Sequence, residues 1–220
     1  TGSGVRASQI GMDKIKSSWL FEEAGLSVPE FAVVGGVKKL MFNFPVVVKP
    51  VDRGSSVGVS VVRNLQELPA ALKLAQKHSQ KLMVQKFIKG RELTCGILEI
   101  NGKPKALPPT EIIPKGGQFF NYRAKYTAGG SNEITPARLT GVQLKAVQEI
   151  AVRAHKTIGA RGMSRTDLIL GEDGKIYILE INTIPGLTET SLLPQEAKAE
   201  GISFPDLLDA IIQSAFQKSH

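Results

Sequence analysis

The chain has 220 residues, one cysteine and a formal net charge of +8 at neutral pH. This length is enough for a substantial hydrophobic core in one or two domains. The lone Cys95 cannot form an internal disulfide, which fits a reducing cytoplasm, and the three histidines lack the spacing of a zinc site. No apolar run is long enough to span a membrane. The basic residues are dispersed, so charge alone does not distinguish a nucleic-acid binder from a protein that binds a small polyanion.

The N-terminal part predicts a helix, an extended segment and then a strand, a loop and a strand. The helix is expected from Met12 to about Ala24, because Gly25 follows it, and the extended segment covers residues 30–34. Lys49 ends an otherwise apolar strand, and Ser55 and Ser56 lie in a glycine-containing loop over residues 53–58. Such a loop suits a phosphate, because glycines permit close backbone approach and hydroxyls donate hydrogen bonds. An ordinary Gly/Ser hairpin is the alternative.

The middle of the chain predicts a helix over residues 65–77 and strands over 82–88, 91–100 and 103–107, with a tight hairpin at Asn101 and Gly102. Glu92, at the start of its strand, is either a ribose ligand or a solvated edge carboxylate. Residues 108–136 are poorly periodic and rich in aromatic residues. Because a loop of this length is usually functional or disordered, and aromatic content argues against disorder, we expect an ordered loop over a site.

The C-terminal part predicts a helix over residues 140–158, an acidic hairpin and a last helix from Leu207 to about Phe216. In the hairpin, residues 171–174 form the turn, and Glu180 and Asn182 leave the same face of the second strand. Antiparallel pairing would bring Asp167 of the first strand next to them. Three oxygen ligands suit a hard cation such as Mg²⁺. The alternative is a hairpin with acidic turn residues and one capped polar pair.

Several segments, taken in chain order, resemble the ATP-grasp superfamily and, more closely, the D-alanine–D-alanine ligases. They are residues 49–50, 53–58, 122–126, 165–167, 180–186 and 191–194. The resemblance implies an α+β fold, the ATP-grasp fold, whose two α+β subdomains enclose a nucleotide site. Residues 1–107 would form the central subdomain and residues 108–220 the C-terminal one. The resemblance also implies that the chain lacks an N-terminal domain of roughly ninety residues, so the fragment is expected to ligate poorly or not at all.

The resemblance further implies a role for individual residues. Those that would bind ATP are Lys14, Lys49, Ser55, Ser56, Gln85, Lys86, Phe87, Ile88, Glu92, Phe119, Lys125 and Leu179. Those that would bind two Mg²⁺, or Mn²⁺ in its place, are Asp167, Glu180 and Asn182. Those that would act in catalysis are Arg165, Tyr126, Lys125, Gly186 and Ser55, and those that would hold the amino-acid substrates are Arg165, Gly186, Ser191 and Leu192. Gln85 stands where most relatives carry a glutamate, so adenine selectivity is open.

The implied activity is ATP-dependent ligation of two D-alanines through an acyl phosphate, in the cytoplasm, for peptidoglycan precursors. The implied partners are ATP and D-alanine, with neither nucleic acid nor membrane, and a homodimer is left open for a full-length protein. Tyr126 favours D-alanyl-D-alanine over the D-lactate product, although a tyrosine can also simply pack under the loop. The alternatives are a nucleotide-binding module that is inactive alone and another carboxylate–amine ligase, such as one making D-Ala-D-Lac or D-Ala-D-Ser.

Overall fold

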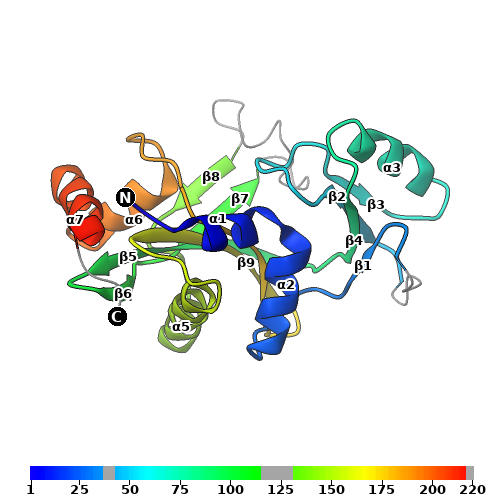
Figure 1. The fold of residues 1–220 in the computed structure, drawn as a ribbon. Coiled ribbons are helices and arrows are strands. Elements are labelled where there is room, and N and C mark those ends of the chain that lie inside the picture. Colours follow the sequence, from blue (N-terminus) through cyan, green and yellow to red (C-terminus); the bar gives the residue numbers. More distant parts are fainter. Residues whose placement is uncertain (37–42, 115–130, 217–220) are drawn as a thin grey trace.

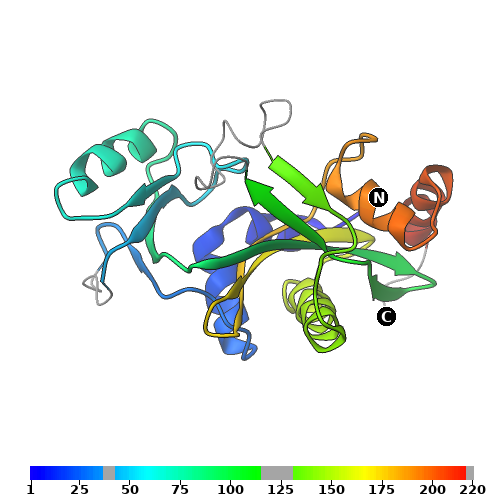
Figure 2. The ribbon, with the colours of Figure 1, turned by 180° about the vertical axis from the view of Figure 1, so that it is seen from behind.

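The computed structural model describes residues 1–36, 43–114 and 131–216. They form an α+β fold with two antiparallel sheets, each packed against helices (Figures 1 and 2). In the described part of the chain, no helix is both long and apolar enough to cross a membrane.

The smaller sheet has the strand order β1–β4–β2–β3. Its strands are β1 (Phe31–Val33), β2 (Val46–Pro50), β3 (Ser60–Val62) and β4 (Leu82–Lys86). Val46 and Val48 of β2 pack with Ala71 and Ala75 of helix α3 (Leu68–Gln76) in one apolar cluster. Because side chains alternate along a strand, Val47 and Lys49 are left on the opposite face of β2.

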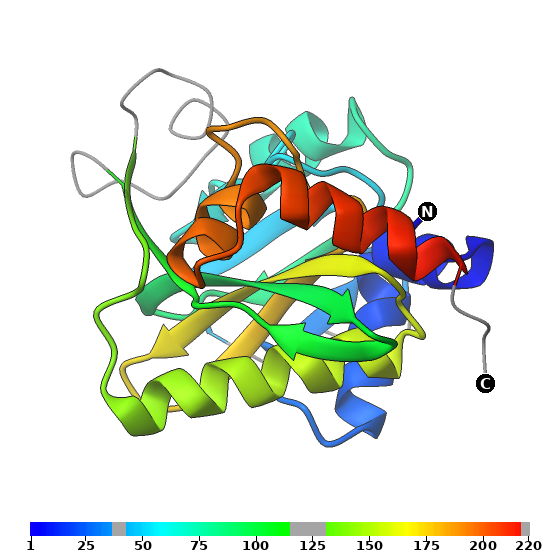
Figure 3. The ribbon, with the colours of Figure 1, turned by 90° about the vertical axis from the view of Figure 1, so that its left-hand side faces the viewer.

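The larger sheet has the order β10–β9–β5–β7–β8, with β6 paired to β5. Its strands are β5 (Gly90–Ile100), β6 (Lys103–Ala106), β7 (Thr110–Pro114), β8 (Ser131–Ile134), β9 (Met163–Gly171) and β10 (Ile176–Asn182). Figure 3 shows α5 (Gly141–Thr157) on one face, and α6 (Leu192–Ala199) and α7 (Phe204–Phe216) on the other. Cys95 and Ile97 of β5 belong to the apolar cluster under α5, whereas Leu98 belongs to the cluster under α6 and α7. The central strand is therefore buried on both faces.

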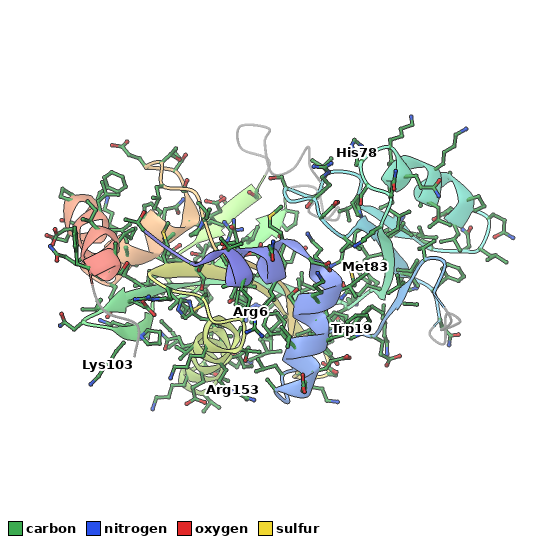
Figure 4. All side chains as sticks on the ribbon, viewed as in Figure 1. Arg6, Trp19, His78, Met83, Lys103 and Arg153 are labelled. Atoms are coloured by element: carbon green, nitrogen blue, oxygen red, sulfur yellow. The ribbon has the colours of Figure 1, made fainter. Side chains whose placement is uncertain are left out.

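The N-terminal helices α1 (Val5–Met12) and α2 (Lys14–Glu23) both contact β10. Asp13 caps α2, because its carboxylate accepts from the backbone N–H groups of Ile15 and Lys16. Trp19 of α2 is 54% exposed and its ring lies 6.4 Å from that of Phe31 (Figure 4). The cap thus fixes the start of α2 at Lys14.

A buried polar group joins α5 to the larger sheet. His155 Nδ1 lies 2.8 Å from the Ser164 hydroxyl, and His155 Nε2 lies 3.5 Å from Glu99 Oε1. This order of serine, histidine and carboxylate is that of a catalytic triad, but His155 is only 1% exposed and Ser164 is fully buried. No substrate can reach the serine, so the group is structural. Burial lowers the pKa of His155, although Glu99 opposes this effect.

Most predicted elements are confirmed, and three expectations are corrected. Residues 108–136 are not one long loop, because β7 and β8 lie inside that range. Helices α1 and α6 were not predicted: α1 is short and has a polar, glycine-containing sequence, and α6 contains a proline in its first turn. The division at residues 107 and 108 remains a prediction. Because β5 and β6 pair within the larger sheet, a boundary near Gly90 would follow the sheets more closely.

The close approach of α6 to β5 predicts a strong effect of Gly96→Ala. A Cβ atom at Gly96 would lie 2.5 Å from both Glu196 Oε2 and Leu193 Cδ1, which are buried and cannot retreat into solvent. We expect a loss of about 2–4 kcal/mol in the free energy of unfolding, measured with urea. Gly141→Ala is the matched control, because nothing lies within 4 Å of that position. Equal stabilities of the two variants would contradict the packing described.

Candidate active site

Two adjoining cavities lie between the two sheets. The first has a volume of about 600 Å³ and is lined from β2, β4, β5, β7, β9 and β10. The second has a volume of about 400 Å³ and is lined from β9, β10, the loop before α6 and the Gly/Ser loop at residues 53–58. Four charged residues line both cavities, namely Lys14, Arg53, Asp167 and Glu180. These residues therefore lie where the cavities meet.

The structure brings together most of the predicted site residues. Those that line the first cavity are Lys14, Lys49, Ser56, Gln85, Phe87, Ile88, Glu92, Leu179, Asp167 and Glu180. Those that line the second are Lys14, Ser55, Arg165, Asp167, Glu180, Asn182, Gly186, Ser191 and Leu192. Lys86 differs, because its ammonium lies 3.6 Å from Glu30 and its side chain lines a third cavity. The predicted residues Phe119, Lys125 and Tyr126 lie outside the described residues.

The β9–β10 hairpin holds the acidic residues together. Its register pairs Glu180 with Asp167 and Asn182 with Arg165, as antiparallel pairing of the predicted strands requires. The register shifts between Ile178 and Glu180. Such an irregularity lets two successive residues serve one face, and indeed both Leu179 and Glu180 line the first cavity. The hairpin therefore offers an apolar side chain and a carboxylate to the same space.

Asp167 and Glu180 each form an ion pair with a cationic side chain. Lys14 Nζ lies 3.1 Å from Glu180 Oε2, and Arg165 donates through Nε at 2.8 Å and a terminal nitrogen at 3.0 Å to the two oxygens of Asp167. Burial disfavours the charge of Arg165, but the charge of Asp167 outweighs burial, so the pKa of the guanidinium is raised. The site therefore keeps its charges paired within the protein.

The Gly/Ser loop is held from both sides. Lys14 Nζ donates to the carbonyl of Arg53 at 2.6 Å, and Arg53 Nε donates to the carbonyl of His78 at 2.7 Å, beyond the end of α3 (Figure 4). Ser55 and Ser56 have φ angles of 57° and 56°. Two successive non-glycine residues in the left-handed region carry strain, which is most often found in functional loops.

Gln85 and Glu92 occupy opposite walls of the first cavity. Gln85 is 2% exposed, and its side-chain amide donates to the carbonyl of Pro29 at 3.4 Å. Glu92 lies near the start of β5, as predicted, and this strand is not at an edge of the sheet, because Glu92 is paired with Ile112 of β7 on one side and Ile169 of β9 on the other. A carboxylate at the centre of the sheet, facing the cavity, favours the ligand role over that of a solvated edge residue.

The loop between β10 and α6 closes the second cavity. Asn182 Oδ1 accepts from the backbone N–H of Ile184 at 3.0 Å, which orients the amide. The Ser191 hydroxyl accepts from the backbone N–H of Thr188 at 3.1 Å and lies 2.8 Å from its hydroxyl. Ser191 then precedes the first residue of α6, Leu192. Backbone N–H groups at a helix N-terminus attract anions.

Sequence reasoning missed a charged group that also lines the first cavity. Glu111 of β7 pairs with Arg91 of β5 at 2.8 Å and with Arg138 at 3.1 Å, and Arg91 also donates to the Arg138 carbonyl at 2.7 Å. The hydrogen bond from Arg91 lowers the pKa of Glu111. The group was missed because residues 108–136 were interpreted as loop. Three of the residues 110–113 are β-branched, and this enrichment was the signal that could have identified β7.

Glu196 was also missed, although it lies behind the second cavity. It is fully buried on α6, and its Oε2 accepts from the backbone N–H of Gly96 at 2.6 Å. Gly96 is paired across the sheet with Arg165. Burial raises the pKa of Glu196 well above its usual value, and the Gly96 N–H and the charge of Arg165 only partly oppose this. Glu196 thus ties α6, with Ser191 and Leu192 at its start, to the strand pair that carries Arg165.

Comparison with known proteins identifies this fold. A family model described as D-ala D-ala ligase C-terminus matches residues 20–213. The D-alanine–D-alanine ligase of Leptospira interrogans is 44% identical over the whole chain, which covers 66% of that protein. The ligase of the same name from Desulfotalea psychrophila is 45% identical over 99% of the chain, which covers 70% of that protein. The chain thus spans about two thirds of these relatives.

Two solved structures have the same fold. The VanG D-Ala:D-Ser ligase from Enterococcus faecalis aligns with a TM-score of 0.87 and 35% identity, over 96% of this chain and 64% of that one. The D-alanine-D-alanine ligase from Coxiella burnetii aligns with a TM-score of 0.82 and 30% identity, over 97% of this chain and 59% of that one.

Two sheets with a cavity between them, matched in this way, define the C-terminal region of an ATP-grasp protein. The expected α+β ATP-grasp fold is confirmed. Within that class, the chain belongs to the family of D-alanine–D-alanine ligase C-terminal regions.

The burial of Glu196 predicts a pH-dependent stability. The pKa of Glu196 is raised in the folded state. Its contribution to stability is therefore complete below about pH 4.5, the pKa in the unfolded chain, and is lost as the pH rises toward the pKa in the folded state. The side chain of Glu196→Gln stays neutral. We therefore expect the free energy of unfolding of the variant, relative to that of the wild type, to increase by about 1–3 kcal/mol between pH 5 and pH 8, measured with urea. Glu149→Gln, on the exposed face of α5, is the control. A constant difference between Glu196→Gln and wild type would contradict the raised pKa.

Proposed function

We propose that this chain is the ATP-grasp portion of an ATP-dependent ligase that joins two D-alanines to D-alanyl-D-alanine through an acyl phosphate, for peptidoglycan precursors. Membership of the family supports the chemistry, and the family uses ATP. The observation that carries the proposal is the position of Asp167 and Glu180 at the junction of two cavities. A nucleotide in the larger cavity would direct its terminal phosphate to this junction, and an amino acid in the smaller one would meet it there.

In the first cavity, cationic residues would contact the phosphates of the nucleotide, and mostly apolar residues would contact its base. Lys14 and Lys49, both 7% exposed, would contact the phosphates, and Ser56 belongs to the loop that would cover them. Gln85, Phe87, Ile88 and Leu179 would surround the adenine, and the backbone of residues 87–88 would read its edge. Glu92 would accept from the ribose hydroxyls. The aliphatic lining supports this division, since a cofactor site is mostly apolar with a few fixed polar groups.

The donor set at the hairpin fits Mg²⁺. Asp167, Glu180 and Asn182 supply two carboxylates and one amide oxygen at one end of the β9–β10 hairpin. Mg²⁺ prefers oxygen ligands and is usually held by one or two carboxylates together with substrate phosphates and water. When bound, the metal would supply charge that neutralises the phosphates during transfer. MnCl₂ is expected to substitute for MgCl₂, because the ligand types are the same.

In the second cavity, the residues of the chain would position the acyl group and the incoming amine. Arg165 is locked by Asp167 and would face the oxyanion that forms when the amine attacks the acyl carbon. The backbone N–H of Gly186 would donate to the same oxygen. Ser191 and Leu192, at the start of α6, would bind the carboxylate of the second D-alanine. Ser55 would orient substrate from the Gly/Ser loop. No protein nucleophile is required, because phosphorylation activates the carboxylate and positioning supports the attack.

A D-Ala:D-Ser ligase is the second candidate. The specific observation is the alignment with the Enterococcus faecalis enzyme of that name over 96% of this chain. Thr190 and Ser191 line the second cavity with hydroxyls, which would hydrogen-bond to the side chain of D-serine, and the Thr188 hydroxyl contacts both of them. D-Ala-D-Lac formation is a further member of the same reaction class.

The test of the proposal is calorimetry of Mg²⁺-dependent ATP binding to this chain, repeated with D-alanine or D-serine and followed by mass spectrometry of the products. Binding together with dipeptide would support a ligase and identify its second substrate. Binding without any dipeptide would support a nucleotide-binding portion that depends on the rest of a longer protein. No ATP binding would contradict the roles proposed for Lys49 and Asp167.

Asp167→Asn predicts a selective loss of metal-dependent binding. The amide keeps the size of the side chain but removes the charge that faces Arg165 and the junction of the cavities. We expect ATP affinity in the presence of Mg²⁺ to fall at least about tenfold, or about 1.4 kcal/mol. Calorimetry of ATP binding with and without Mg²⁺ measures the effect. Asp173→Asn, at the exposed turn of the same hairpin, is the control and should bind as the wild type does.

A further inference from the structure

Lys14 links the two halves of the site. It is the first residue of α2 and only 7% exposed. Its ammonium pairs with Glu180 of β10 at 3.1 Å and donates to the Arg53 carbonyl of the Gly/Ser loop at 2.6 Å. Its backbone N–H donates to the carbonyl of Val51, at the base of that loop, at 3.2 Å. One lysine thus bridges the β9–β10 hairpin and the Gly/Ser loop.

The contact with Glu180 uses an oxygen that the metal needs. In the proposed function Glu180 is a metal ligand and Lys14 is a phosphate ligand, yet here the two are paired with each other. The side chains are 8% and 23% exposed, so solvent screens the pair only partly. A divalent cation that reached Glu180 would lie within a few ångströms of the ammonium and be repelled by it. Metal binding therefore requires Lys14 to move or to gain an anionic partner.

A nucleotide supplies that partner. Lys14 lines the first cavity as well as the second, so a polyphosphate in the first cavity would be within reach of its ammonium. Lys14 could then exchange the carboxylate for a phosphate while the metal takes its place on Glu180. Glu180 would keep a cationic partner throughout, because the divalent metal arrives as the ammonium leaves.

We propose that Lys14 is an internal counter-ion that excludes a divalent metal from Glu180 until a nucleotide is bound. This inference rests on the proposed function, since it takes Glu180 as a metal ligand. It assigns Lys14 a role that phosphate binding alone does not require: setting the order in which ligands enter. The consequence is that metal and nucleotide bind as a coupled pair and that the chain has little affinity for the metal alone.

The test uses Mn²⁺ as the probe, and binding is measured as the loss of its free-ion electron paramagnetic resonance signal beyond the loss that the nucleotide analogue causes without protein. Without nucleotide, we expect Lys14→Met to bind Mn²⁺ about tenfold more tightly than the wild type, the size of one partly screened charge interaction. With a non-hydrolysable ATP analogue, the order should reverse, because Lys14→Met has lost a phosphate ligand. A gain and a loss from one substitution is a signature that a purely structural or purely phosphate-binding lysine would not give.

Lys16→Met is the matched control, because Lys16 lies on the same helix, is 60% exposed and pairs with Asp13 instead. It should behave as the wild type. Lys14→Met combined with Glu180→Gln should lose the gained Mn²⁺ binding, which identifies the site and does not depend on how Lys14→Met alone affects stability.

Unchanged or weaker Mn²⁺ binding by Lys14→Met without nucleotide would overturn the inference. So would a wild-type chain that binds Mn²⁺ equally well with and without the analogue. If the wild type takes up no Mn²⁺ even with the analogue, the proposed metal ligands themselves are wrong, and the inference fails with them. This last result differs from the others because it appears in the wild type in the presence of nucleotide.

Discussion

The antiparallel pairing of β9 with β5 and β10 is the constraint on which the site depends. It places Arg165, Asp167, Glu180 and Asn182 at one end of two neighbouring strands, where all four line the second cavity. Partial burial of four polar side chains there is costly unless each finds a partner. The bidentate pair of Arg165 with Asp167 and the pair of Lys14 with Glu180 meet that requirement within the protein. The same arrangement leaves charges that a ligand can redistribute without uncovering the core.

Local sequence signals predicted the elements that have strong periodicity or an unambiguous turn. The β9–β10 hairpin follows from Gly171 and Gly174, and α5 follows from its apolar spacing and the Thr140 capping box. The elements that were missed depend on long-range packing. β7 is a strand because it pairs with β5 and β8, and α6 exists because its Leu193 and Ala197 fill the space beside Leu98. Tertiary contacts decide such short segments more than their own sequence does.

Prediction of the candidate site from the sequence had the same limit. Residues within one motif, such as Asp167 with Glu180, were placed together because a hairpin brings near neighbours into contact. The Arg91–Glu111–Arg138 group joins three segments that only the folded sheet brings together, and Glu196 reaches Gly96 across 100 residues of chain. Lys86 was grouped with its neighbours by sequence, yet strand alternation turns its side chain toward Glu30. Spacing thus predicts partners within an element, whereas partners between elements require the fold.

The contact between Gly96 and Glu196 has a consequence for how the sequence can vary. One position has no side chain because the other extends into the space that a side chain would fill. A family member with alanine at position 96 is therefore expected to carry a shorter residue at position 196, since the two share one volume. A shorter residue at position 196 would remove one of the two close contacts of an alanine at position 96, and the other, with Leu193, would remain. Positions 100 residues apart are therefore expected to vary together rather than independently.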